Sequence, residues 1–321
     1  MVRGTWARAG FELVRHRDWE TLQKERCNLL AAAVDRSPRA TASSAPVECI
    51  IFSKDRPMQL GALLASLQEK VRPAIPVHIL YRASTDAFEQ GYRLVFRAFE
   101  RQVMPYAERQ FRPDLIAILR SIQATRLFFL VDDNLFIQEC DLDDLHTIDP
   151  SQTIFSLRLG QNLTHAYPLE RPLRAPPLET RPGYPEQLTW RWRGADVAWG
   201  YPLSVDGHVF SSAEMLILAE VMQYAGPNTF EAAMQSFNPC FADRLGACYR
   251  TSRMINVPMN KVQNEIDNPS DNVSVDLLLE KWLSGLALDH RVLYGMKSSD
   301  THHYFTYPLI SRSQLPVYRG I

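Results

Sequence analysis

The sequence predicts an α/β protein with a Rossmann-like, mostly parallel β-sheet flanked by helices. Residues 127–131 are apolar without interruption, as in a strand that is buried on both faces of a parallel sheet. Strand-like and helix-like segments alternate between residues 47 and 136, which is typical of parallel α/β folds. Two of the predicted strands end in polar turns, at residues 53–59 and 132–134. In open α/β sheets the ligand crevice lies beyond the carboxyl ends of the strands, so these turns are the first candidates for a binding site.

Length and composition are those of an ordinary soluble protein. The chain has 321 residues, 46% hydrophobic and 22% charged, which is enough for one large domain or two small ones. Its formal net charge of −1 gives no reason to expect a nucleic acid or an anionic membrane as partner. No apolar run approaches the roughly 20 residues that a membrane-spanning helix needs. The first residues lack the apolar segment of a signal peptide.

Cysteine usage predicts a reducing compartment. The five cysteines are odd in number, isolated and without the spacing of metal sites. Free thiols in the cytoplasm are therefore the expectation. The cysteines are Cys27, Cys49, Cys140, Cys240 and Cys248.

The N-terminal residues 1–46 are predicted to form a helical extension and a linker. Apolar positions recur at near-helical spacing over residues 9–35, with charges between them. Residues 37–46 are small and polar and contain two prolines, as in an exposed connection. The extension is expected either to pack on the main domain or to serve in association.

Strands and helices then alternate. The segments expected before the apolar run are strands at 47–52 and 76–81 and helices at 60–70, 88–99 and 114–124. The turn after the first strand carries Lys54, Asp55 and Arg56, where a nucleotide would be gripped. It has no glycine, which argues against both a dinucleotide-binding loop and a P-loop. The alternative is a solvated turn.

The apolar run ends in Asp132, Asp133 and Asn134. Two adjacent carboxylates at the end of a buried strand are unfavourable unless a positive group meets them. A divalent cation is the expected partner, because hard cations take oxygen ligands and also bind substrate phosphates. The alternative is that Asp and Asn only supply turn chemistry.

Downstream segments are less regular. Residues 153–159 are expected to form a strand, whereas residues 166–193 contain six prolines without periodicity and are expected to form a long loop. Trp190, Trp192 and Trp199 could form a wall that stacks on a sugar or base, or could pack in the core.

Several polar residues in this part of the chain are candidates for chemistry. Asp206 and His208 flank Gly207, so both could approach a pocket closely. Glu231 is expected in the first turn of a helix that follows Gly226, where the helix dipole would keep it ionised. His302 and His303 are adjacent, so their side chains diverge and at most one is expected to act as a ligand.

Three motifs together resemble the GT-A type of nucleotide-sugar-dependent glycosyltransferase. They are Ile51-Phe-Ser-Lys-Asp-Arg-Pro57, Phe129-Leu-Val-Asp-Asp-Asn134 and Tyr201-Pro-Leu-Ser-Val-Asp-Gly-His208. The resemblance covers roughly residues 47–305. The second motif departs from the family pattern, because it reads Asp-Asp-Asn in place of Asp-x-Asp.

The resemblance implies a set of roles. Phe52, Ser53, Asp55 and Arg56 would hold the nucleoside, with Arg82 near the base or ribose. The triplet would hold Mn²⁺ or Mg²⁺, with Asp133 and Asn134 assigned to the metal and Asp132 to the nucleotide, although the departure from Asp-x-Asp leaves open which of the three touches metal and which touches ribose. His302 or His303 would complete the metal shell. A carboxylate would deprotonate the acceptor hydroxyl, with Glu231 favoured over Asp206 and an inverting outcome expected.

The implied domain plan is a donor-binding half at 47–160 and an acceptor-binding half with the C-terminal tail at 161–321. The partners would be a nucleotide-sugar donor and a saccharide or other hydroxyl acceptor, with a homo-oligomer as an option. Two other functions stay open: a sugar-phosphate nucleotidylyltransferase, and a nucleotide- or carbohydrate-binding protein without catalysis.

Overall fold

The structure is a computed structural model, and it describes residues 19–36, 47–166, 169, 171–260, 273–303 and 308–319. The first part of the predicted N-terminal helices, at residues 9–18, and the predicted linker at 37–46 lie outside the described residues. The remainder of the extension is helix α2, Trp19–Arg36.

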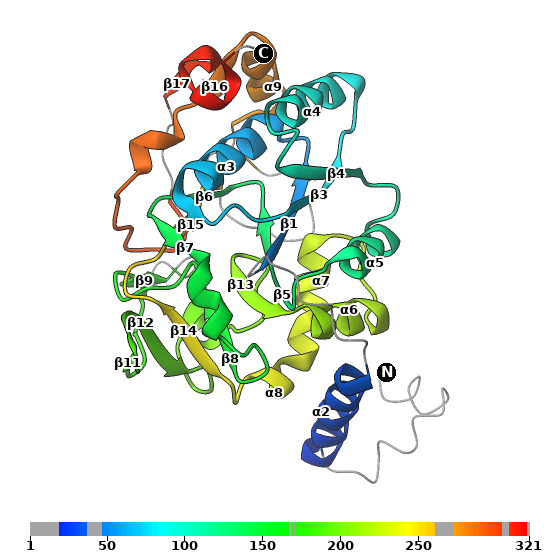
Figure 1. Cartoon of the computed structure of the whole chain (residues 1–321), viewed down its shortest axis with the longest axis vertical. Coiled ribbons are helices and arrows are strands. Elements are labelled where there is room, and N and C mark those ends of the chain that lie inside the picture. The colour runs from blue at the N-terminus through cyan, green and yellow to red at the C-terminus, as the bar shows by residue number, and fades with distance from the viewer. Residues whose placement is uncertain are drawn as a thin grey trace.

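A nine-stranded sheet forms the centre of the molecule (Figure 1). From one edge to the other its strands are β11 (Glu179–Arg181), β12 (Tyr184–Arg191), β14 (Leu245–Tyr249), β8 (Thr153–Ser156), β13 (His208–Ser211), β5 (Arg126–Val131), β1 (Glu48–Lys54), β3 (Val77–Arg82) and β4 (Val103–Ala107). Only β12 and β13 run against the others, so seven of the nine strands share one direction. The predicted α/β class with a mostly parallel sheet is confirmed.

Four two-stranded pairs surround the main sheet. They are β2 (Val71–Arg72) with β7 (Cys140–Asp141), β6 (Asn134–Phe136) with β15 (Met254–Asn256), β9 (His165–Ala166) with β10 (Arg171–Pro172), and β16 (Leu286–Leu288) with β17 (Leu309–Ser311). The β6–β15 pair matters for function, because it begins at Asn134 and so continues directly from the acidic triplet.

Helices cover both faces of the sheet, and two hydrophobic clusters lie beneath them. One cluster includes residues of α3 (Pro57–Lys70), α4 (Asp86–Ala98) and α9 (Val275–Leu283). The other includes residues of α2, α5 (Phe111–Ser121), α6 (Ser212–Val221), α7 (Pro227–Met234) and α8 (Asn238–Phe241). The 3₁₀ helices are η2 (Leu142–Thr147), η3 (Val197–Gly200), η4 (Gln235–Phe237), η5 (His290–Leu293), η6 (Arg312–Gln314) and η7 (Pro316–Tyr318).

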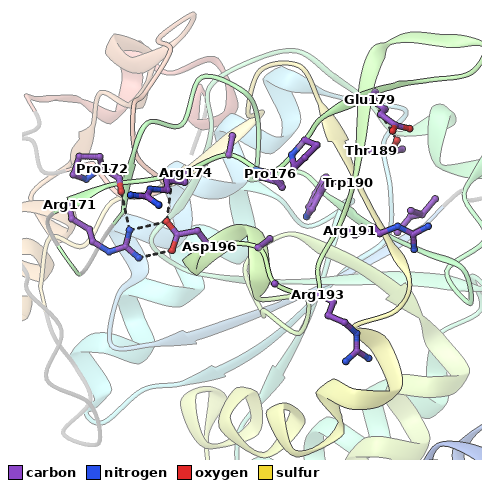
Figure 2. A pocket seen from close by; sticks show the side chains of 15 residues that line it. Arg171, Pro172, Arg174, Pro176, Glu179, Thr189, Trp190, Arg191, Arg193 and Asp196 are labelled. Carbon is purple, nitrogen blue, oxygen red and sulfur yellow. Dashed lines mark hydrogen bonds and ion pairs between the residues drawn. The ribbon is translucent and has the colours of Figure 1, made fainter.

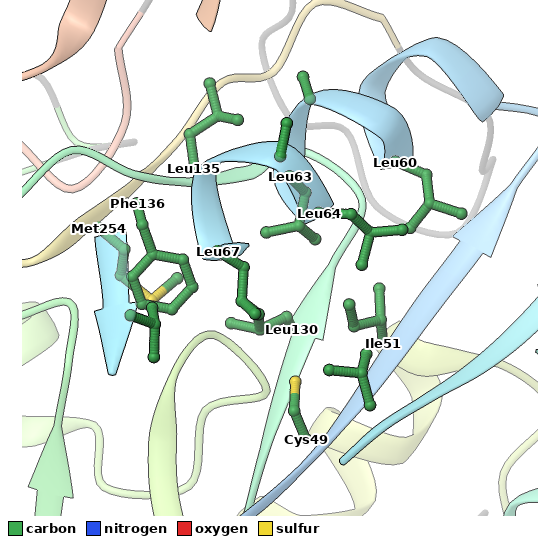
Figure 3. Packing of buried hydrophobic residues seen from close by; sticks show 14 of the residues in the cluster. Cys49, Ile51, Leu60, Leu63, Leu64, Leu67, Leu130, Leu135, Phe136 and Met254 are labelled. Atoms are coloured by element: carbon green, nitrogen blue, oxygen red, sulfur yellow. The ribbon is translucent and has the colours of Figure 1, made fainter. Parts of the chain in front are cut away.

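Strand β1 shows why the sheet needs both layers. Cys49 and Ile51 point into the first cluster, while Ile50 and Phe52 point into the second, because successive strand residues face opposite sides. Figure 3 shows the first layer, where leucines of α3 pack over Ile51 of β1 and Leu130 of β5. All four of these β1 residues are at most 2% exposed, which fixes the position of the strand ends that carry the site.

Five strands of the central sheet were not predicted: β4, β11, β12, β13 and β14. The predicted loop at 166–193 is wrong in part, because β12 occupies Tyr184–Arg191 and pairs with β14. Gly183 turns the chain between β11 and β12 with a φ of 80°, a conformation that glycine adopts without strain. Of the two interpretations of the tryptophans, core packing holds: Trp190, Trp192 and Trp199 are 3%, 1% and 0% exposed.

The expectation of five free thiols is wrong. Cys27 of α2 and Cys240 of α8 form a disulfide, with Cα atoms 5.1 Å apart, while Cys49, Cys140 and Cys248 are free and buried. The two partners are 213 positions apart, so sequence spacing could not reveal the pair. The pair removes the cysteine argument for a reducing compartment, and the cytoplasmic location stays a prediction.

Among the described helices, none has the length and apolar character to span a bilayer.

A buried hydrogen-bond cluster around Glu48 anchors the amino end of β1 and gives a prediction for stability. Glu48 accepts hydrogen bonds from the backbone amides of Gln123 and Ala124, each at 2.7 Å, and lies 2.8 Å from His78 Nε2. Glu48→Ala leaves these donors buried without an acceptor, and we expect the free energy of unfolding to fall by about 3–5 kcal/mol. Urea denaturation measures the change. Glu100→Ala, at an exposed position after α4, is the control and should lie within about 0.5 kcal/mol of the wild type.

Candidate functional site

The candidate site lies along one edge of the central sheet. The carboxyl ends of β1, β5 and β8 meet there, because these strands are parallel in direction. Strand β13 is antiparallel to β5 and β8, so its amino end, which follows Asp206, comes to the same edge. Sheet topology therefore brings together the turn after β1, the acidic triplet after β5 and Asp206.

Asp132 is held by groups of the β1–α3 turn. Its Oδ2 accepts hydrogen bonds from Ser53 Oγ at 2.8 Å and from the backbone amide of Lys54 at 3.2 Å. Its Oδ1 accepts from Arg56 Nη1 at 2.9 Å. Ser53 Oγ also lies 2.7 Å from the hydroxyl of Tyr92. Both oxygens of Asp132 are thus engaged within the protein.

The positive group that meets the two carboxylates in this structure is Arg56. Its Nη1 lies 2.9 Å from Asp132 and 3.9 Å from Asp133. Nε donates to Asn260 Oδ1 at 2.7 Å, and Nη2 donates to the Asn260 carbonyl. Burial opposes the charged form of Arg56, but the two carboxylates outweigh it and raise the pKa of the guanidinium. The sequence predicted a divalent cation for this compensating role and assigned Arg56 to the nucleoside instead.

Asp133 is the acid of the triplet with the weakest internal contacts. Its side chain is 17% exposed, and Asn256 Nδ2 lies 3.5 Å from its Oδ1. Burial raises the pKa of this carboxyl to about 7, with the charges of Asp132 and Asp206 adding to the rise and Arg56 opposing it. Ionisation of Asp133 is thus unfavourable in the protein alone. A cation bound next to this carboxylate would favour the ionised form and lower its pKa.

Asn134 has a structural role in this arrangement. It is fully buried, and its Oδ1 accepts from the amide of Val131 at 2.9 Å. Its Nδ2 donates to Asp206 Oδ1 at 3.4 Å. The amide oxygen that a metal would use is therefore already bonded to the strand end.

His302 and Asp133 are the side chains that could bind a divalent cation at this edge. Burial lowers the pKa of His302 well below its usual value, so the imidazole is neutral and has a nitrogen lone pair. A backbone bridge joins His302 to Asn256, the residue whose amide contacts Asp133. Nonetheless, no group of three or more His, Cys, Asp or Glu side chains suited to a metal occurs in the described ranges. Metal binding at Asp133 and His302 therefore stays a prediction.

Asp206 forms an ion pair with Arg158, a residue that was not among the candidates from the sequence. Arg158 Nη1 lies 2.6 Å from Asp206 Oδ2 and 3.4 Å from Asn256 Oδ1. Arg158 follows β8 and is 7% exposed, so it connects the triplet side of the site to the Asp206 side. Its Nε is buried and has no hydrogen-bond partner, which leaves a donor unused within the site.

Glu231 lies in the second turn of α7, which begins at Pro227, so the expected first-turn position is wrong. Its carboxylate accepts hydrogen bonds from the hydroxyl of Tyr201 at 3.0 Å and from the amide of Val205 at 2.8 Å. Burial and the nearby charge of Asp206 raise the pKa of Glu231 to about 7, in contrast to the ionised state expected from the helix dipole.

The other residues predicted to bind the nucleotide differ in their exposure to solvent. Phe52 is in the core, with its ring 5.2 Å from that of Phe111, and Asp55 is buried with both oxygens bonded to Ser84. Arg82 is 58% exposed at the same sheet edge and lies 3.7 Å from Glu108. Of these residues, Arg82 is the one whose side chain reaches solvent.

The two neighbours of Gly207 face opposite ways. Asp206 points into the site, whereas His208 is 1% exposed and has its Nδ1 2.9 Å from the Pro202 carbonyl. Burial lowers the pKa of His208 to about 3, so it stays neutral. Gly207 has a φ of 71°, and a Cβ there would meet Met254. Glycine is therefore required for the chain to deliver Asp206 to the site.

Sequence reasoning missed Arg158, Tyr92, Tyr201 and Asn256. Arg158 carried the only usable signal, because it is a lone charge within an apolar strand-like segment, Thr153-Ile-Phe-Ser-Leu-Arg-Leu159. Nothing in the local sequence marks Tyr92, Tyr201 and Asn256, because their hydrogen-bond partners come from other segments of the chain.

A concave surface of about 910 Å³ lies away from this site (Figure 2). It lies beside the β11–β12–β14 edge of the sheet, and arginines dominate its charged lining. Of the candidate residues named from the sequence, Trp190 lines it, whereas the predicted catalytic, nucleotide-binding and metal-binding residues do not.

The fold and the site define a class of protein only at the level of architecture: an α/β fold with a mostly parallel sheet and acidic residues at the carboxyl edge of that sheet. No protein-family model matches the sequence, and no curated protein sequence matches it.

Particular solved structures do match. One is the mannosyltransferase PcManGT from Pyrobaculum calidifontis in complex with GDP-Man and Mn²⁺, at 16% identity and a TM-score of 0.30, covering 44% of this chain and 46% of that chain. Another is S. aureus TarS 1-349 in complex with UDP, at 14% identity and a TM-score of 0.40, covering 64% of this chain and 57% of that chain. The complex of TarS 1-349 with UDP-GlcNAc matches at 14% identity and a TM-score of 0.41, covering 77% and 69%. The chain thus spans about half the length of the first two.

The Arg56 contacts predict strong energetic coupling. Arg56→Ala leaves two carboxylates without their counter-charge, and we expect the free energy of unfolding in metal-free buffer to fall by about 3–5 kcal/mol. Asp132→Asn in the same background should recover part of the loss, with a coupling energy of about 0.5–3 kcal/mol in a double-mutant cycle. The exposed pair Arg120–Glu220, 2.7 Å apart, is the matched control and should couple by less than about 1 kcal/mol. Equal coupling in the two cycles would contradict the assigned role of Arg56.

Proposed function

We propose that the protein is a glycosyltransferase that moves a sugar from a nucleotide-diphosphate sugar to a hydroxyl acceptor. One observation carries the proposal. The acids at the sheet edge are paired with arginines, and near them lies a separate carboxylate, Glu231 of α7, whose pKa is raised to about 7. The first group suits a charged donor, and the second suits a general base, which works best when its pKa is near the operating pH.

The donor end is formed by the β1–α3 turn, the triplet and Arg82. Arg56 and Asp132 fix the turn, and Arg82 offers an exposed guanidinium at the end of β3. We propose that Asp133 and His302 hold Mn²⁺ or Mg²⁺. Their chain neighbours Asn134 and His303 would help to position these two ligands. When bound, such a cation neutralises the negative charge that grows on a leaving diphosphate.

Glu231 is the better candidate for the base. Both carboxylate oxygens of Asp206 are occupied within the protein, one by Arg158 at 2.6 Å and the other by Asn134 at 3.4 Å. Glu231 has neutral donors as its hydrogen-bond partners, Tyr201 and the Val205 amide. We propose that Asp206 and Arg158 hold the acceptor side of the site in place, and that Glu231 takes the proton from the acceptor hydroxyl.

Calorimetry with UDP- and GDP-sugars, with and without Mn²⁺, tests the donor assignment. We expect metal-dependent binding and slow hydrolysis of one donor, because water can replace the acceptor. Asp133→Ala should abolish both turnover and the metal dependence while the melting temperature stays near that of the wild type. Asp143→Ala, an exposed acid on η2, is the control and should behave as wild type. Absence of nucleotide binding by the wild-type protein would remove the proposed function and favour a non-catalytic role.

The pH dependence of turnover tests the base. Glu231 must be deprotonated to accept a proton, so we expect kcat to fall as the pH drops below about 7. Glu231→Gln should lower kcat by a factor of about 10²–10⁴ and abolish this acid limb. Asp206→Asn is the comparison: if it removes the limb and Glu231→Gln does not, the role belongs to Asp206.

A further inference from the structure

Four arginines line the concave surface at the β11–β12–β14 edge of the sheet, which we call the arginine groove. They are Arg171, Arg174, Arg191 and Arg193, and two acids, Glu179 and Asp196, accompany them. Figure 2 shows Arg171 and Arg174 on one side of Trp190, and Arg191 on the other. The chain as a whole has a net charge of −1, so this local excess of positive charge is a feature of the groove.

Two of the arginines form ion pairs, whereas the other two only lie near the same acids, Arg174 near Asp196 and Arg191 near Asp243. Arg171 forms a double hydrogen bond with Asp196, at 2.9 and 2.6 Å, and Arg193 lies 2.7 Å from Asp243. Arg174 and Arg191 form no ion pair with any residue in the described ranges, and both are exposed. Because Asp196 is already bonded to Arg171 and to the amide of Arg174, it has little capacity left for the Arg174 guanidinium.

The groove is lined by a rigid frame. Pro172, Pro176 and Pro177 restrict the backbone of one side. Trp190 is 3% exposed and donates a hydrogen bond from Nε1 to the Trp199 carbonyl at 3.0 Å. Gly246 of β14 lies against the Trp190 ring, where a Cβ would clash. A groove that is formed before a ligand arrives loses little conformational entropy on binding.

A short segment of the chain connects the groove to a residue that contacts the candidate base. Asp196 lines the groove, and Tyr201, five residues further on, donates its hydroxyl to Glu231. Five residues span at most about 18 Å even when fully extended. The 3₁₀ helix Val197–Gly200 occupies this segment and shortens the distance. A saccharide chain of a few units could therefore extend from the acceptor position into the groove.

We propose that the arginine groove binds the acid groups of an anionic acceptor saccharide. Guanidinium groups match carboxylate and phosphate oxyanions through paired N–H donors, and Arg174 and Arg191 have these donors to offer. The acid groups bind there while a neutral hydroxyl further along the chain faces Glu231. The inference rests on the proposed glycosyltransferase function for its placement as an acceptor subsite.

Calorimetry on the full chain tests the groove with three probes: trigalacturonate as the carboxylate, glucose 6-phosphate as the phosphate, and maltotriose as the neutral saccharide. We expect an anionic probe to bind, with affinity that falls between 50 and 200 mM NaCl because salt screens the charges. Maltotriose should bind at least tenfold more weakly. Whichever anion binds more tightly identifies the acid group.

The double variant Arg174→Gln/Arg191→Gln should weaken anion binding at least tenfold and leave nucleotide-sugar hydrolysis unchanged. Arg97→Gln/Arg101→Gln removes the same charge from exposed positions at the end of α4 and should retain wild-type affinity. An equal loss in the two variants, or no binding of either anion, would overturn the proposal. If the anion binds in the groove but no nucleotide sugar is bound or hydrolysed, the transferase function fails and the groove stands as an anionic-saccharide site.

Discussion

Charge compensation between Arg56 and the carboxylates of Asp132 and Asp133 is the constraint on which the site depends. The two acids follow a strand whose residues 127–130 are fully buried, and Asp132 itself is 4% exposed, so water cannot solvate them fully. Arg56 supplies the counter-charge from the neighbouring turn and connects to Asn260 at the same time. The turn after β1, the end of β5 and the segment at Asn260 are thereby fixed relative to one another. A donor site needs this order in its protein groups before a substrate binds.

Electrostatics also separates the roles of the remaining acids. Asp132 and Asp206 each have an arginine within 3 Å, at 2.9 and 2.6 Å, and both arginines are largely buried. Asp133 and Glu231 have weaker or neutral partners, and their pKa values are raised to about 7. Four carboxylates in one region thus form two charged pairs and two groups that can respond to a ligand. This division follows from contacts between β8, β13 and α7, which are remote in sequence.

The sequence was informative where physical signals are local. The apolar strand at 127–131, the acidic triplet and the helix at 60–70 all follow from neighbouring residues, and the structure contains each of them. Strands β12 and β14 were missed because prolines and short length obscure their alternation. The partners of Arg56 and Arg158, and the pairing of Cys27 with Cys240, depend on residues about 50 to more than 200 positions away. No local pattern encodes such contacts. The sequence therefore predicted several of the residues that form the site, but not which of them contact one another.

The position of β13 has a consequence for how the chain folds. This strand comes from the C-terminal half, yet it pairs with β5 on one side and β8 on the other. During synthesis, β5 and β8 leave the ribosome well before residues 208–211, so each keeps an unpaired edge until β13 arrives. Completion of the sheet is therefore a late, long-range event of the kind that slows folding. Recombinant halves divided near residue 160 would carry those open edges permanently and would be prone to aggregate.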